Sequence, residues 1–87
     1  MVVDLGIVDS VRKAARVAGQ ELNIRLNIMD SRVNGALAGC SNDPNIPKYQ
    51  GLYDSSANNI RQLVETLEAI ATHMDSLYEK IESYMNS

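Results

Sequence analysis

Apolar residues recur every three or four positions along the first half of the chain, from about residue 5 to residue 38. The stripe consists of Val11, Ala15, Ala18, Leu22, Leu26, Met29, Val33 and Leu37. Side chains at this spacing lie on one side of an α-helix, so the pattern predicts a long amphipathic helix over residues 5–38. No proline interrupts the segment.

A second apolar stripe follows, and its spacing is more regular. Its members alternate by four and three residues: Ile60, Val64, Leu67, Ala71, Met74, Tyr78, Ile81 and Met85. Spacing of this kind is typical of a helix that winds around another helix. Four more residues widen the stripe: Leu63, Ile70, Leu77 and Tyr84. The pattern predicts a second helix over about residues 55–85.

The segment between the stripes, residues 39–54, is predicted to be a loop. Pro44 and Pro47 disfavour helical geometry at the residues before them. Short polar side chains at Asp54, Ser55 and Ser56 offer N-caps for the second helix. Residues 1–87 are therefore expected to form one all-α domain, an antiparallel two-helix hairpin.

A second apolar line on the first helix indicates a partner. At 100° per residue, Val17, Ile24 and Ile28 fall on one line that lies away from the Val11–Val33 stripe. A helix with one neighbour needs one apolar stripe, so the second line predicts a partner-binding surface. A chain of 87 residues also buries only about 60% of its unfolded surface. The hairpin is expected to pair into a four-helix bundle, as a homodimer or a heterodimer.

Composition and charge narrow the classes of partner. The net charge is −3 and no run of basic residues occurs, which argues against nucleic acid. No segment has the roughly 18 apolar residues of a membrane span. The first residues lack a basic region followed by an apolar run, so we expect synthesis in the cytoplasm without a cleaved signal peptide.

Candidate catalytic and metal-binding residues are few. His73 has no acidic residue one helical turn away, and Cys40 has no second cysteine with which to pair. The Asn-Asp-Pro-Asn run at 42–45 lacks the alternating acids of a calcium loop. The glutamates of the second helix do not form Glu-x-x-His pairs. We expect a binding protein, not an enzyme, with no cofactor and no metal.

The length, the hairpin and two short motifs together resemble the WXG (ESAT-6-like) superfamily of small helical proteins of type VII secretion. The motifs are Tyr49-Gln50-Gly51 between the helices and Tyr78-x-x-x-Glu82 near the C-terminal end. Members of this superfamily carry Trp-x-Gly at the bend, and Tyr49 stands where they have tryptophan. The resemblance implies a bend motif at Tyr49 and Gly51 and an export signal at Tyr78 and Glu82.

A subgroup without a strict Trp-x-Gly is also similar to this chain. Its members are encoded beside LXG toxins, bind the helical N-terminal domain of the toxin and supply part of the export signal. The resemblance thus implies either a secreted substrate or a targeting partner of a toxin, handled by the secretion machinery. An unrelated dimeric helical adaptor or chaperone module is the alternative that the residues leave open.

Overall fold

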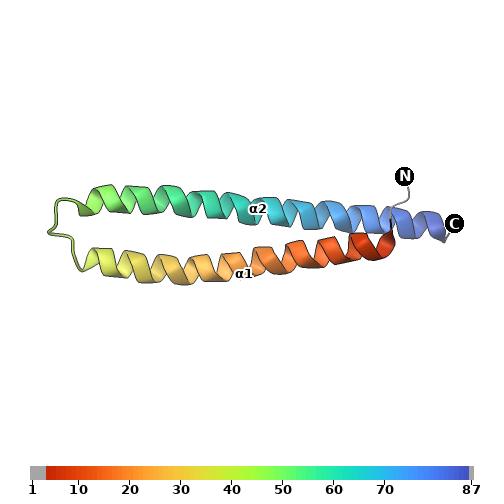
Figure 1. The fold of residues 1–87 in the computed structure, drawn as a ribbon, viewed down its shortest axis with the longest axis horizontal. Coiled ribbons are helices and arrows are strands. Elements are labelled where there is room, and N and C mark those ends of the chain that lie inside the picture. The colour runs from red at the N-terminus through yellow and green to blue at the C-terminus, as the bar shows by residue number, and fades with distance from the viewer. Residues whose placement is uncertain (1–3, 87) are drawn as a thin grey trace.

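The computed structural model describes residues 4–86, which form two α-helices and, within that range, no strand. Helix α1 spans Leu5–Ala38 and α2 spans Ile46–Met85. They run in opposite directions and pack side by side, with the loop at one end and both chain termini at the other (Figure 1). The predicted all-α hairpin is confirmed.

Helix α1 begins and ends where the sequence predicts. The side chain of Asp4 accepts a hydrogen bond of 2.7 Å from the backbone N–H of Gly6, which satisfies one of the unpaired amides of the first turn. At the other end, the N–H groups of Gly39 and Cys40 donate to the last carbonyls of the helix. The loop that follows contains residues 39–45 alone.

Helix α2 begins at Ile46, nine residues before the predicted start, so the predicted loop over residues 39–54 is too long. Pro47 lies at the first or second helical position, where a missing N–H costs nothing and the fixed φ suits the helix. The Asp43 side chain prepares this start by accepting the N–H of Asn45 at 2.8 Å. The predicted N-caps at residues 54–56 lie inside α2 and are wrong.

The bend predicted at Tyr49 and Gly51 is also wrong. Both residues lie in the first turns of α2, and no residue from 4 to 86 has a positive φ. A Cβ at Gly51 would have open space around it, so no close approach requires this glycine. The ring of Tyr49 is more than half exposed and does not cover the end of the hairpin. The chain turns at residues 39–45 instead.

The core is a thin line of small side chains between the helices. Its members on α1 and α2 are Val8, Ala15, Gly19, Leu26, Ala57, Val64 and Ala71. The members on α2 repeat every seven residues, as expected for helices that keep one seam together. Leu26, with 1% of its surface exposed, is the one large side chain that is fully buried within residues 4–86. Alanine and glycine at the seam bring the two helices close, but they bury little apolar area.

The hairpin is a rod rather than a globule. Its extents are 67 × 19 × 14 Å and its radius of gyration is 19.5 Å. A compact domain of this length would have a radius of gyration of about 12 Å. At a rise of about 1.5 Å per residue, α2 is about 9 Å longer than α1, and its last turns continue past the start of α1 (Figure 1).

Candidate partner-binding face

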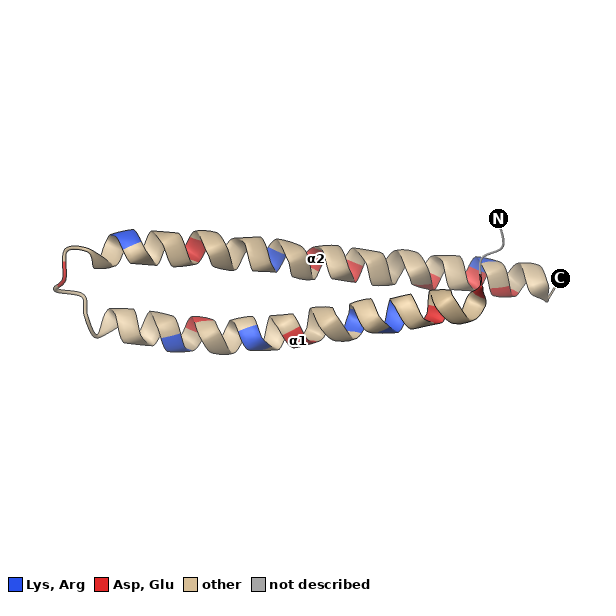
Figure 2. Ribbon diagram, viewed as in Figure 1, with Lys and Arg blue, Asp and Glu red and all other residues tan. Residues whose placement is uncertain are grey.

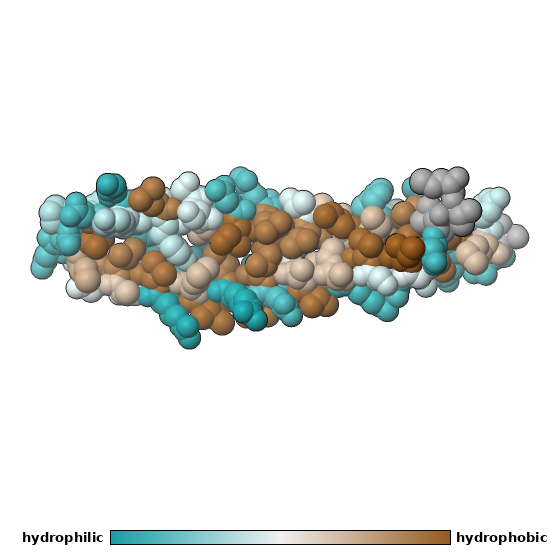
Figure 3. All heavy atoms as spheres, viewed as in Figure 1, coloured by the Kyte–Doolittle hydropathy of each residue, from teal (hydrophilic) through white to brown (hydrophobic). Residues whose placement is uncertain are grey.

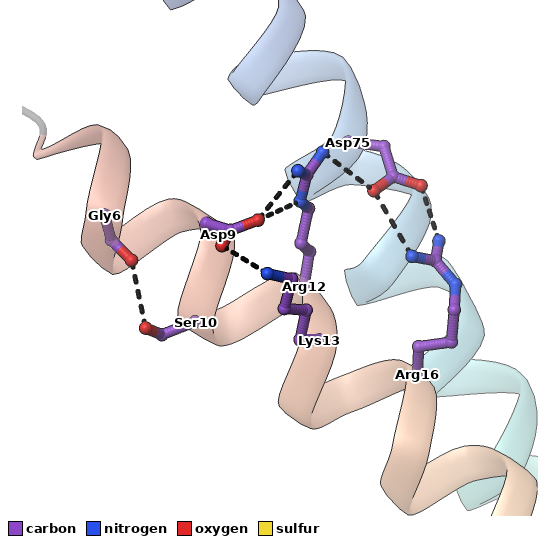
Figure 4. Close-up of polar contacts among 7 residues, drawn as sticks. All are labelled: Gly6, Asp9, Ser10, Arg12, Lys13, Arg16 and Asp75. Carbon is purple, nitrogen blue, oxygen red and sulfur yellow. Dashed lines mark hydrogen bonds and ion pairs between the residues drawn. The ribbon is translucent and has the colours of Figure 1, made fainter.

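Ion pairs join the helices near the start of α1 (Figure 4). The Asp75 carboxylate of α2 lies between two guanidinium groups of α1, 3.6 Å from Arg12 and 2.5 Å from Arg16. Arg12 also pairs with Asp9 at 2.7 Å, and its guanidinium carbon is 3.8 Å from the centre of the Tyr78 ring. One aspartate of α2 is thus held by two arginines of α1, and one of these arginines covers an aromatic ring.

A second group of polar contacts joins the helices nearer the loop. The Tyr53 hydroxyl donates to one Asp30 oxygen at 2.7 Å, and Arg61 pairs with the other. One turn closer to the loop, the side-chain N–H of Gln50 donates to the side-chain amide oxygen (Oδ1) of Asn34 at 2.9 Å. Each of these contacts crosses from α2 to α1.

Both groups lie on the same side of the rod. Arg16 and Asp30 are fourteen residues apart on α1, and so are Arg61 and Asp75 on α2. Two heptads return a side chain to the same side of a coiled helix. We call this side the sealed flank; its interhelical contacts are made by Arg12, Arg16, Asp30, Asn34, Gln50, Tyr53, Arg61 and Asp75.

The contacts of the sealed flank stabilise the charge states of its members. The hydrogen bond from Arg16 lowers the pKa of Asp75, and the charge of Arg12 adds to this effect. The pKa of Asp9 is lowered by hydrogen bonds from Lys13 and then Arg12. Donation to Asp30 raises the pKa of Tyr53, because the bond requires the protonated phenol. Acids and bases on this flank therefore satisfy one another within the chain.

The other side of the helix contact carries apolar side chains. Asp75 follows the buried Ala71 by four residues, about 40° around α2, whereas Ile70 precedes it by one residue, about 100° in the opposite sense. On α1, Leu22 precedes the buried Leu26 by the same spacing with which Asp30 follows it. We call this side the open flank; its apolar members are Val11, Ala18, Leu22, Met29, Leu63, Ile70 and Leu77.

No part of the chain from residue 4 to residue 86 covers the open flank. Leu63 and Met29 are 49% and 42% exposed, and Ile70 is exposed as well. The remaining members are half-buried, because each touches the seam with one side only. Figure 3 shows hydrophobic side chains in a band that runs along both helices between more polar margins. Within residues 4–86, nothing packs over this long apolar surface.

The exposed area of the whole chain points the same way. A folded monomer of 9.6 kDa exposes about 5,100 Å². This chain exposes 6484 Å², which is about 1,400 Å² more than that expectation. A stable protein–protein interface buries about 800 Å² on each partner. The rod therefore has enough surplus surface for one standard interface.

The predicted partner-binding residues Val17, Ile24 and Ile28 are exposed, with Ile24 at 59%. Each lies two residues from a buried position, Gly19 or Leu26, and thus about 160° around α1 from the seam. They lie on the back of α1, away from α2, and only Ile28 reaches the groove beside the open flank. Partner binding at these three residues stays a prediction.

The predicted export-signal residues have different surroundings. The Tyr78 ring is half-buried, and Arg12 covers it. Glu82 is exposed one turn further along α2, with no ion pair to any residue from 4 to 86. The carboxylate of Glu82 is therefore accessible to a receptor, whereas Tyr78 also contributes to packing. Their role in export stays a prediction.

The remaining candidates do not assemble into a site. Cys40 is a free, exposed thiol in the loop, and His73 is exposed on α2. Residues 4–86 contain no group of three or more histidines, cysteines or acids placed to hold a metal ion. Neither helix, over the described residues, is both long and apolar enough to cross a membrane.

Acidic residues predominate along the C-terminal half of α2, and basic residues lie on the part of α1 beside it (Figure 2). Comparisons with protein families, with curated proteins and with solved structures found no match to this chain.

The role of Asp75 and the residues of the open flank were not identified from the sequence. No motif in the sequence singles out Asp75, although it anchors α2 to two arginines of α1. The open flank was visible as a widening of the α2 stripe by Leu63, Ile70 and Leu77. The members of the open flank on α1 (Val11, Ala18, Leu22 and Met29) were predicted as part of the core stripe. Spacing alone does not show which side of this stripe α2 leaves uncovered.

Proposed function

We propose that this chain is a protein-binding hairpin whose open flank packs against a second helical protein, so that four helices share one core. The observation that carries this proposal is the imbalance between the two flanks. Polar contacts within the chain satisfy the sealed flank, whereas the open flank keeps Leu63, Ile70 and Met29 in water. Exposure of a large aliphatic side chain costs about 1.5 to 3 kcal/mol relative to burial, so a partner with an apolar helix face stabilises the hairpin.

We propose further that the pairing serves type VII secretion, either as a secreted substrate or as a targeting partner that escorts an LXG-type toxin domain. Support comes from the length, the helical hairpin and the Tyr78-x-x-x-Glu82 motif on the last turns of α2. The exposed Glu82 carboxylate fits the role of a recognition element that a receptor reads on the hairpin. The Tyr49-Gln50-Gly51 motif lies within α2 rather than at a bend, so it does not support the proposal.

Coexpression with the products of neighbouring genes tests the pairing. We expect one of them to form a stable complex, whose mass is measured by light scattering after size exclusion. Ile70→Asp should abolish the complex, because a carboxylate would be buried without a counter-charge. Ala69→Asp, at an exposed position next to it, is the matched control and should leave the complex intact. A complex that survives Ile70→Asp would show that the open flank is not the contact surface.

Export by a type VII-competent host tests the second part. Glu82→Gln should reduce export and leave the thermal melt unchanged, whereas the same substitution at the exposed Glu79 should affect neither. If export needs the secretion ATPase but Glu82→Gln is exported like the wild type, the Tyr78-x-x-x-Glu82 motif is not the export signal. If neighbouring genes encode no secretion component and no export occurs, the helical adaptor or chaperone is the better reading.

A further inference from the structure

The five arginines of the chain fall into two groups. Arg12, Arg16 and Arg61 are each paired with an aspartate on or beside the sealed flank. Arg25 and Arg32 lie on the other side of α1, and within residues 4–86 neither makes an ion pair or a side-chain hydrogen bond. The unpaired arginines are thus confined to the side of the apolar surface.

Arg25 and Arg32 bracket an apolar groove on α1. The groove is lined by Leu22, Ile28 and Met29 together with the two arginines. The arginines are seven residues apart, so their origins are about 10.5 Å apart along the helix axis. This distance equals two helical turns, and a helix lying alongside would meet it with side chains that are also seven residues apart.

Glu21 is the one acid of α1 that lies on the side of these arginines, so a second copy offers one carboxylate of α1 for two arginines. On α2 the acidic residues fall on the sealed side or on the outer surface: Asp54, Glu65, Glu68, Asp75, Glu79 and Glu82. On α1, Asp9 and Asp30 are paired with basic residues of the same chain, and Glu21 is exposed one helical turn before Arg25. Two copies joined symmetrically near the groove would therefore pair at most one arginine of each copy with Glu21 and leave the other arginine without a carboxylate from α1.

We propose that the open flank and its groove bind a helix of a different protein, in which a large apolar side chain is bracketed by two acidic residues seven positions apart. The apolar side chain fills the groove, and the two carboxylates pair with Arg25 and Arg32. This inference rests on the proposed pairing function and adds the chemistry of the partner. A helical protein fits better than an anionic membrane, because the cationic rim holds only two arginines and the chain carries a net charge of −3.

Synthetic helical peptides of about three heptads serve as probes. Each has leucine along one face, and the three versions place two glutamates, two glutamines or two lysines seven residues apart around a central leucine. Binding to the full chain is measured by fluorescence anisotropy at low and high salt. The glutamate peptide should bind about tenfold more tightly than the lysine peptide, and the difference should shrink with salt.

Two double variants, each reversing two positive charges, make the test specific. Arg25→Glu with Arg32→Glu should reverse the preference, so that the lysine peptide binds more tightly. Lys48→Glu with Lys80→Glu makes the same change in net charge at exposed positions away from the groove, and the glutamate preference should persist.

Several results would overturn the inference, and they separate it from the proposed pairing. If all three peptides bind equally and Ile70→Asp abolishes binding, the open flank does bind a helix, but Arg25 and Arg32 do not select acidic residues on it. If no peptide binds, pairing through this flank fails as well. A tight homodimer that excludes the glutamate peptide would make a second copy the occupant. Binding to phosphatidylserine vesicles with loss on Arg25→Glu would make it a membrane.

Discussion

Replacing Gly19 with alanine is expected to stabilise the hairpin by about 1 kcal/mol. Gly19 is buried at the seam and has an ordinary helical backbone, so its conformational freedom only adds to the entropy lost on folding. A Cβ at this position would lie 3.5 Å from the Leu67 Cβ and 3.9 Å from the Val64 carbonyl oxygen. Both are normal contact distances, so the helix propensity gain of about 0.8 to 1 kcal/mol is not lost to a clash.

The melting temperature reports this change. For a chain of this size, about 1 kcal/mol corresponds to a rise of about 4 to 8 °C in a thermal melt followed by circular dichroism. Gly35→Ala is the matched control, because a Cβ there has nothing within 4 Å and gains helix propensity alone. Gly19→Leu should lower the melting temperature, since its longer side chain must push the helices apart.

Two results would contradict this packing of Gly19 against α2. If Gly19→Ala lowers the melting temperature while Gly35→Ala raises it, the helices approach each other more closely than the Gly19–Leu67 distance indicates. If Gly19→Leu is as stable as Gly19→Ala, the side of α1 that carries Gly19 does not face α2 in solution.

Three further outcomes are expected. Leu26→Ala should cost about 2 to 5 kcal/mol in urea unfolding, because it empties the site of the most deeply buried large side chain, whereas Glu68→Ala should change little. The lowered pKa of Asp75 means that its contribution to stability is complete above its unfolded value of 3.8 and is lost as the pH falls through the folded value. The difference in free energy of unfolding between the wild type and Asp75→Asn should therefore become smaller in acid. A difference that does not change with pH would contradict the ion pairs. The raised pKa of Tyr53 gives the opposite pH dependence, because the stability that Tyr53 contributes is complete below the unfolded pKa of 10.0 and is lost as the pH rises through the folded pKa. Melts at increasing pH should therefore show a smaller alkaline loss of stability for Tyr53→Phe than for the wild type.

The sequence predicts the hairpin well because both helices are long and strongly periodic. It misplaces the start of α2 because Pro47, Gly51 and the Asp54–Ser56 run each resemble a helix boundary when they are considered locally. Tertiary contacts decide otherwise. Gln50 and Tyr53 hydrogen-bond to α1 and extend α2 toward the loop, which outweighs about 1 kcal/mol for a glycine within the helix.

The two flanks were harder to predict for a different reason. The pairing of Arg16 with Asp75 joins residues that are 59 positions apart, and it depends on how the two helices are aligned. That alignment follows from the loop length, which the sequence overestimated. Once the loop is limited to residues 39–45, the polar residues of both helices meet on one side, and the apolar residues beside the seam are left on the other.

Site-specific photocrosslinking in the producing cell reports which side of the hairpin another protein covers. A photoreactive phenylalanine derivative replaces Ile70 on the open flank or, in the control, Glu65 on the outer surface of α2. If the open flank is the docking surface, position 70 should give a discrete crosslinked product with one helical protein, and position 65 should give none. Crosslinking from position 65 but not from position 70, or no product from either while the protein is folded, would contradict docking through the open flank.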